Sequence, residues 1–248
     1  MRTLCKHLLF PPVCAGCGER FTITPASPCP PLFCATCEQL YEKAMREECP
    51  SCHLAYYQCT CMPSAMERAG VKAHVKLAPY GEGSESRVIR HIVLDMKKKR
   101  RDALAARCAT DLSKGVLTAL LEEGIEREEA LIVALPRGLK NRRRYGLDQA
   151  HLLALALSDV TQIPSQKALL RQKEAKVQKT LSEKDRAKNM ANAFVALPVV
   201  KGRAVILVDD VVTTGASMQA ATKALLQAGA TAVIGVSLAS TKKKRKHA

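Results

Sequence analysis

The feature that most constrains this chain is a stretch near its C-terminus, residues 204–217, which reads AVILVDDVVTTGAS. Four apolar residues at 205–208 lead into two adjacent carboxylates, Asp209 and Asp210. A continuous apolar run bounded by turn residues is typical of a buried strand in a parallel sheet. The small residues that follow predict a loop over 211–217, and MQAATKALLQAG then has the pattern of a helix. The stretch therefore predicts an α/β fold with two carboxylates at the carboxyl end of a buried strand.

Ligands of open α/β sheets bind at the carboxyl ends of the strands. There, two carboxylates can accept hydrogen bonds from a vicinal diol, and a loop of small residues at a helix start can surround a phosphate with N–H groups. This pairing suits ribose 5-phosphate, and the stretch resembles the signature of type I phosphoribosyltransferases that binds 5-phosphoribosyl 1-pyrophosphate (PRPP). A strand, an acidic pair and a turn in another α/β fold is the plainer alternative. The predicted PRPP contacts here are Asp209 and Asp210, which are also the predicted catalytic residues, with Val211, Thr213, Thr214, Gly215, Ala216 and Ser217.

Ten of the eleven cysteines lie before residue 62 and mark a second module. Eight of them form four close pairs, and such pairs place two thiolates on one metal ion, so that two pairs complete a tetrahedral site. Sequence order predicts one structural Zn²⁺ on Cys14, Cys17, Cys34 and Cys37, and a second on Cys49, Cys52, Cys59 and Cys61. Sites closed by four cysteines are structural, because no coordination position stays open. A segment this small and this poor in core residues needs such staples to fold.

Three alternatives to this zinc scheme stay open at the level of sequence. The four pairs could combine in an interleaved order, His53 could replace a cysteine ligand, or the cysteines could form disulfides, although no secretory context is visible. Cys5, Cys29 and Cys108 are interpreted as spare thiols, and Cys108 is expected to pack in a helix.

The composition is that of a globular protein with one good core and a small accessory module. Hydrophobic residues make up 47% of the 248, and no apolar run approaches the roughly 18 residues of a membrane-spanning helix. The N-terminal segment lacks the apolar core of a signal peptide, so we expect a cytoplasmic protein without membrane insertion. The formal charge of +16, which eight thiolates and two Zn²⁺ would lower to about +12, favours an anionic ligand, a nucleic acid, or both. Aromatic residues at 4% argue against a broad base-stacking platform for single strands.

Apolar periodicity organises the rest of the chain after a connector at 62–70. Further strands are predicted at 71–80, 130–135 and 231–238, and helices at 84–97 with a cap at Ser84-Glu85-Ser86, at 102–123 and at 147–161. Arg137 lies in the loop after the strand at 130–135, where its guanidinium can contact phosphate.

Basic residues gather in three runs, at 97–101, 142–144 and 242–246. A solvated helix end is the plainer interpretation of the first run, whereas the last predicts a tail suited to nucleic acid. The polar segment 172–192 is interpreted either as a mobile flap over the ligand or as a surface loop and helix.

The order of these motifs resembles the ComF/GntX-like family, competence-associated proteins of phosphoribosyltransferase fold with an N-terminal double zinc ribbon. The family's Arg-Gly-Phe-Asn-Gln element appears at 145–149 as YGLDQ, with Tyr145 and Asp148 in place of the usual arginine and asparagine and with Arg144 adjacent. Lys97 matches the lysine that ends the family's first helix. A second family string is represented by Arg171, Lys173, Gln178, Leu181, Arg186, Asn189 and Phe194.

The resemblance covers nearly the whole chain and implies a type I phosphoribosyltransferase-like parallel sheet flanked by helices, at 70–240. A double zinc-ribbon module at 1–65 would precede it, and a basic tail at 241–248 would follow. The family implies a role in DNA uptake during natural transformation through single-stranded DNA, beside a helicase-like competence protein. Lys97 and Arg137 would neutralise the pyrophosphate of PRPP, with Mg²⁺ bridging. The alternative is an active phosphoribosyltransferase that transfers ribose 5-phosphate from PRPP to a base or an amine.

Overall fold

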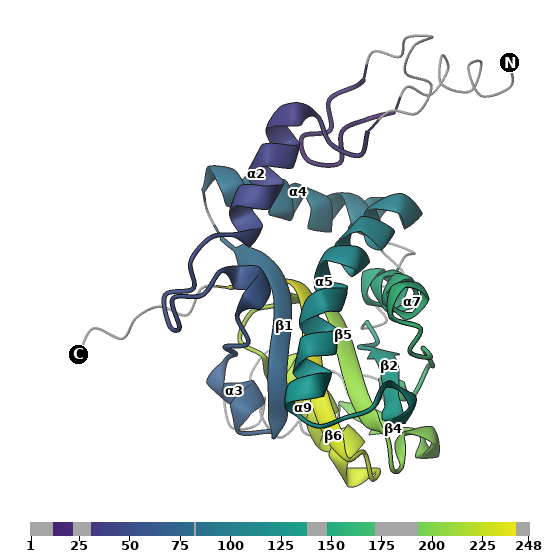
Figure 1. The fold of residues 1–248 in the computed structure, drawn as a ribbon. Helices are drawn as coiled ribbons and strands as arrows, with labels where there is room; N and C mark the ends of the chain where they lie inside the picture. Colours follow the sequence, from purple (N-terminus) through teal and green to yellow (C-terminus); the bar gives the residue numbers. More distant parts are fainter. Residues whose placement is uncertain (1–11, 22–30, 82, 138–147, 172–192, 242–248) are drawn as a thin grey trace, which may run out of the picture.

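A parallel sheet forms the centre of the computed structural model, which describes residues 12–21, 31–81, 83–137, 148–171 and 193–241 (Figure 1). Its four strands lie in the order β1-β6-β5-β2 and are all parallel, as the apolar runs predicted. They are β1 (Val71–Tyr80), β2 (Ala130–Ala134), β5 (Ala204–Val212) and β6 (Ala232–Thr241). A small antiparallel pair is formed by β3 (Leu169–Arg171) and β4 (Phe194–Ala196).

Helices cover both faces of the sheet. One face packs against α4 (Ser84–Lys98), α5 (Asp102–Glu122) and α7 (Gln149–Thr161), and the other against α3 (Ser64–Glu67) and α9 (Ala216–Gln227). The remaining described helices are α2 (Ala35–Met45) and three short 3₁₀ turns, η1 (Tyr56–Gln58), η2 (Arg127–Glu129) and η3 (Pro198–Val200). In the described part of the chain, no helix has the length and apolar character that crossing a membrane requires.

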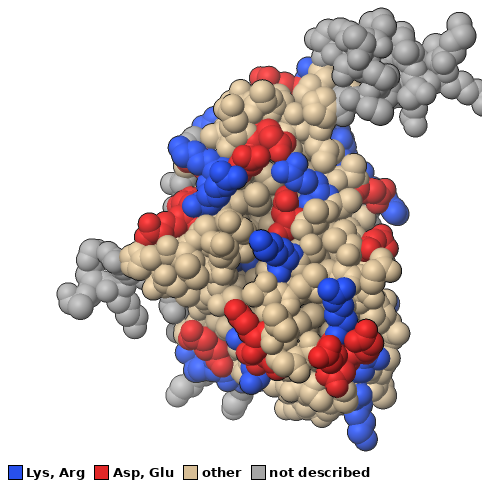
Figure 2. All heavy atoms as spheres, viewed as in Figure 1, with Lys and Arg blue, Asp and Glu red and all other residues tan. Residues whose placement is uncertain are grey.

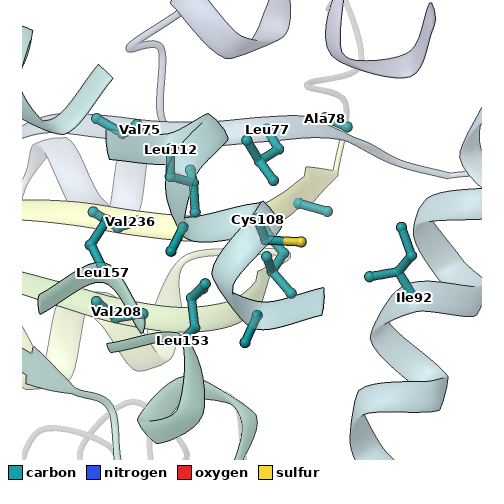
Figure 3. Packing of buried hydrophobic residues seen from close by; sticks show 14 of the residues in the cluster. Val75, Leu77, Ala78, Ile92, Cys108, Leu112, Leu153, Leu157, Val208 and Val236 are labelled. Atoms are coloured by element: carbon teal, nitrogen blue, oxygen red, sulfur yellow. The ribbon is translucent and has the colours of Figure 1, made fainter. Parts of the chain in front are cut away.

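Alternating side chains of each strand serve two separate cores. Ile206 and Val208 of β5 belong to the core under α5 and α7, whereas Val205 and Leu207 belong to the core under α9. Figure 3 shows the first core, where Val208 lies close to Leu153 of α7. Each fully buried side chain of this size contributes about 1.5–3 kcal/mol. Burial on both faces explains why these strands have continuous apolar sequences rather than alternating ones.

The cysteine-rich module shares the first core with the α/β part. Tyr41 of α2 is fully buried and stacks on Phe33 with ring centroids 5.2 Å apart. Its hydroxyl donates to Asp111 Oδ2 of α5 at 2.8 Å, and Arg107 of α5 pairs with Glu38 of α2 at 2.9 Å. The module is therefore packed onto α4 and α5 as well as linked to them by the chain.

Several element boundaries differ from the sequence prediction. β5 continues through both carboxylates to Val212, because it stays in register with β6 as far as Ser240, so the predicted loop beginning at 211 is wrong. α9 begins at Ala216 rather than 218, and β6 extends to Thr241. The predicted serine cap at the start of α4 is also wrong: Gly83 is the N-cap, and no side chain caps that helix.

Candidate functional site

Four predicted site residues meet at the carboxyl edge of the sheet. Asp209 and Asp210 lie near the end of β5, Arg137 lies just beyond β2, and Lys97 lies in the last turn of α4. The Arg137 guanidinium donates to Asp210 Oδ2 at 2.8 Å, and Lys97 Nζ lies 3.5 Å from the same oxygen. Residues from three separate segments therefore form one cluster of two cations around one carboxylate.

The two adjacent acids occupy different electrostatic environments. Because side chains alternate along a strand, Asp210 follows Val208 toward the face of α4, whereas Asp209 follows Leu207 toward the face of α9. Burial raises the pKa of Asp209 well above its ordinary value, and the charge of Asp210 adds to this rise. Burial acts in the same direction on Asp210, but the charges of Lys97 and Arg137 outweigh it and lower the pKa of Asp210.

The resulting pair consists of a protonated acid beside an ionised one. Asp209 Oδ1 accepts the N–H of Asp210 at 2.8 Å, and Asp210 Oδ1 accepts the N–H of Val211 at 2.8 Å. The Asp210 side chain is 15% exposed and Lys97 26%, so both are accessible from solvent at the strand ends. Such a site can exchange hydrogen bonds with hydroxyl groups, and its excess of cations over ionised carboxylates attracts an anion.

The segment after β5, residues 213–217, is called the phosphate loop below. Thr213 and Thr214 are exposed, and Gly215 is the N-cap of α9. The hydroxyl of Thr241 donates to the carbonyl of Thr213 at 3.0 Å, which joins the loop to the end of β6. The first N–H groups of a helix have no intrahelical acceptor, and the helix dipole favours an anion beside them. The loop therefore has the geometry of a phosphate cradle.

Gly215 brings the phosphate loop against α3, a contact that the sequence reasoning missed. Its φ is 77°, which favours glycine. A Cβ at this position would lie 2.9 Å from Met66 Cγ and 3.1 Å from Pro63 Cβ, so no side chain fits. Residues 62–70 had been interpreted only as a connector. The available signal was the apolar pair Met62 and Met66 at helical spacing.

The eight paired cysteines form two quartets in sequence order. The first quartet is Cys14, Cys17, Cys34 and Cys37, and the second quartet is Cys49, Cys52, Cys59 and Cys61; within each, the sulfur atoms lie within 4.8 Å of one another. Sulfur atoms around a tetrahedral Zn²⁺ with bonds of about 2.3 Å are separated by about 3.8 Å, so both quartets fit the ion. The structure groups the pairs as sequence order predicted and not in an interleaved way.

Local donors also suit metal-binding thiolates. The N–H groups of Gly16 and Cys34 point at Cys14 Sγ, at 3.3 and 3.2 Å. Although burial opposes ionisation, backbone donors lower the pKa of Cys14 and of Cys49 to about 7. The nine described cysteines are all free of disulfides.

Two other predictions about the module have clear outcomes. His53 lies outside the second quartet and pairs with Glu48 instead. Cys108 packs in α5 as expected, buried beside the hydroxyl of Tyr41.

The basic run at 97–101 divides into two kinds of residue. Lys97 faces Asp210, and Arg101 pairs with Asp95 at 2.7 Å, so the interpretation as a solvated helix end is wrong for these two. Lys98, Lys99 and Arg100 are exposed. The described residues do not include Cys5, Cys29, the basic runs at 142–144 and 242–246, the family element at 145–147, or the polar segment 172–192.

Comparisons with known proteins agree with this geometry. Residues 153–248 match a family model described as phosphoribosyl transferase domain. The chain is 28% identical over 209 residues to the DNA utilization protein YhgH of Escherichia coli K12, covering 81% of this chain and 87% of that protein. It is 38% identical over 103 residues to Competence protein F of Haemophilus influenzae, covering 40% and 44%. Among solved structures, the allosteric regulatory enzyme of purine biosynthesis is 20% identical with a TM-score of 0.38, over 58% of this chain and 30% of that one.

Proposed function

Because this chain belongs to the ComF-like family, we propose that it binds PRPP at the carboxyl edge of its sheet and serves DNA uptake through single-stranded DNA. The observation that carries the ligand assignment is the convergence of Lys97, Arg137 and Asp210 beside the phosphate loop. These residues come from three segments far apart in the sequence, and each supplies a group that one part of PRPP requires.

Each part of PRPP has a matching partner in this arrangement. The phosphate loop receives the 5-phosphate on N–H groups at the start of α9, and the acid pair receives the ribose hydroxyls. Lys97 and Arg137 receive the pyrophosphate. Because both cations already share Asp210, part of the pyrophosphate charge is left for Mg²⁺, which binds phosphate oxygens and would arrive with the ligand.

The DNA assignment is supported by exposed cations beside this cleft. Lys98, Lys99 and Arg100 directly follow Lys97 and are exposed. Arg100 also lines, with Lys167, a cavity of about 420 Å³ between the end of α4 and α7. The molecular face in Figure 2 carries basic and acidic side chains interspersed, so a DNA strand would contact a local group of cations rather than a uniformly basic surface. The relatives' names, DNA utilization protein and Competence protein F, favour the same class of partner. A helicase-like competence protein completes this proposal.

A second candidate function is turnover of PRPP, with transfer of ribose 5-phosphate to a base or an amine. The ionised Asp210 beside the proposed ribose position favours it, because a carboxylate stabilises the positive charge that develops on the ribose when pyrophosphate leaves. Binding and turnover use the same residues, so only an assay of the reaction separates them.

Calorimetric titration with PRPP, with and without Mg²⁺, tests the ligand assignment. We expect wild type to bind, and Lys97→Met to lose at least about tenfold in affinity, because a charge-assisted hydrogen bond contributes about 1.5–3 kcal/mol. Lys98→Met is the matched control and should bind as wild type, because Lys98 is exposed at the helix end. Failure of wild type to bind PRPP would contradict the assignment. Pyrophosphate release in the presence of a base or amine would select the enzyme, and binding without release the DNA-uptake protein.

Salt dependence tests the DNA assignment. Replacing Lys98, Lys99 and Arg100 together by alanine should lower single-stranded DNA affinity and reduce the slope of log K against log salt by about 2, because each phosphate contact contributes about 0.7 for single strands. PRPP affinity, measured on the same variant, should stay unchanged. Tight DNA binding that persists at high salt, or a slope that the variant leaves unchanged, would argue against this surface.

A further inference from the structure

A cavity of about 180 Å³ lies between the second quartet and the phosphate loop. Cys49 and Cys61 line one side of it, and Thr213 and Thr241 line the other. Lys76 of β1 also lines it and is 3% exposed. One predicted metal site is therefore adjacent to the proposed phosphate site, although the two lie at opposite ends of the sequence.

The chain itself joins these two sites over a very short distance. Cys61 of the second quartet is followed by Met62 and Pro63, and Pro63 is one of the two residues that a Cβ on Gly215 would strike. The other is Met66 of α3, which is fully buried. α3 thus fills the space between the phosphate loop and the sheet (Figure 1). A close-packed interior transmits displacements, so movement of α3 moves the loop.

Lys76 ties the second quartet to the sheet. Its amine donates to the carbonyls of Cys59 at 2.8 Å and Cys61 at 2.7 Å, and lies 3.3 Å from Cys59 Sγ. A buried ammonium is stable only with such partners. In the sheet, Lys76 is in register with Ser237 of β6, which is in register with Asp209 of β5. A row of polar side chains on one face therefore leads from the second quartet to the acid pair.

From these contacts, and resting on the proposed function, we infer that the metal-bound second quartet positions the phosphate loop for the 5-phosphate of PRPP. Pro63, Met66 and Lys76 act as the positioning residues. The ion fixes Cys59 and Cys61, which fixes residues 62–66, and these hold Gly215 in its strained backbone conformation. Loss of the ion releases this support, and the loop must then be ordered when the ligand binds, which lowers affinity.

The first quartet offers a matched comparison because it packs elsewhere. The carbonyl of Ala15 accepts from or pairs with His91 Nδ1 at 3.0 Å, and a Cβ on Gly16 would lie 3.3 Å from Val88 Cγ1. Both partners lie in α4, several turns before Lys97 at its end. A general loss of stability would follow removal of either ion, whereas a positioning role belongs to the second quartet alone.

Two small ligands separate positioning from general stability. Ribose 5-phosphate probes the phosphate loop and the acid pair, and pyrophosphate probes Lys97 and Arg137. The variants are Cys61→Ser in the second quartet, Cys61→His as a conservative rescue, and Cys17→Ser in the first quartet, each assayed for zinc content. We expect Cys61→Ser to lose one zinc and at least about tenfold in ribose 5-phosphate affinity, the equivalent of one charge-assisted hydrogen bond, with pyrophosphate affinity unchanged. Cys61→His should restore both zinc and affinity, and Cys17→Ser should lose one zinc but keep ribose 5-phosphate affinity.

Pro63→Ala keeps all eight cysteines and covers the case in which Cys61→Ser does not fold. It should retain two zinc ions and weaken ribose 5-phosphate binding alone. Unchanged ribose 5-phosphate affinity in Cys61→Ser, or in Pro63→Ala where the cysteine variant is unfolded, would overturn the inference. Equal losses for both ligands and both quartets would overturn it too, in favour of a purely structural role. Wild type that binds neither ligand would instead refute the proposed function on which the inference rests.

Discussion

Replacing each acid of the pair by asparagine should change stability in opposite directions. Asp210→Asn removes the carboxylate that Arg137 and Lys97 share, at 2.8 and 3.5 Å. Asp209→Asn keeps the shape of the side chain and an oxygen that can accept the N–H of Asp210. It also removes an acid whose ionisation is opposed by burial and by the charge of Asp210. The first change should therefore destabilise the protein, and the second should leave its stability equal or higher.

The magnitude follows from the burial of the ion pair. Breaking a fully buried pair costs about 3–5 kcal/mol, and the 15% exposure of Asp210 places this site lower, at about 2–3 kcal/mol by the same rule. For a chain of this size each kcal/mol shifts the melting temperature by about 2–4 °C, so Asp210→Asn should melt about 4–12 °C below wild type. Thermal denaturation followed by circular dichroism measures this directly.

The pH dependence distinguishes the two acids further. The raised pKa of Asp209 means that the folded state binds a proton more tightly than the unfolded state, so its contribution to stability falls as pH rises above about 4. The advantage of Asp209→Asn should therefore be larger at pH 8 than at pH 5. The lowered pKa of Asp210 gives the opposite sign: its contribution is present above about pH 4 and is lost as pH falls through the folded pKa. Equal melting temperatures for the two variants at pH 8 would refute this assignment of charge.

Three further outcomes test other parts of the molecule. The purified protein should contain close to two zinc ions per chain by metal analysis, and zinc-free protein with paired cysteines would contradict both quartets. Gly215→Ala should weaken PRPP binding measured by calorimetry, because it combines a φ of 77° with a contact of 2.9 Å to Met66 and costs about 1–3 kcal/mol; unchanged binding would show that the loop adjusts freely. Deleting residues 242–248 should lower DNA affinity equally across sequences in a filter-binding or fluorescence assay, with the salt slope falling by about 0.7 per lost phosphate contact; a loss confined to one sequence would point to base recognition.

Much of the fold and of the candidate site could be predicted because the signals were local. An apolar run buried on both faces marks β5 regardless of its partners, and Asp209 and Asp210 follow it directly. The cysteine pairs also carry their own geometry, since two residues between cysteines set the distance between thiolates. The meeting of Arg137 with Asp210 followed from the rule that parallel strands end at one edge.

The contacts that escaped prediction join segments that are distant in sequence. Lys76 stands in a strand whose polar and apolar residues partly alternate, a pattern that predicts solvent on one face, but the second quartet covers that face. The support of Gly215 by Met66 depends on a four-residue helix too short for any periodic signal. The end of β5 was placed early because polar residues usually mark a loop, whereas its register with β6 carries the strand past both acids.

The site therefore has two halves with different supports, and this division explains why they can be perturbed separately. Asp210 faces α4, where its partners Lys97 and Arg137 are held by the end of one helix and the end of β2. Asp209 and the phosphate loop face the other side of the sheet, where α3 and the second quartet provide the packing. β5 connects the halves, because its hydrogen bonds to β6 continue to Val212 and fix the acids relative to the loop. A ligand that reaches both halves, as PRPP would, is held by groups with independent supports, so losses at Lys97 and at Cys61 should add in free energy.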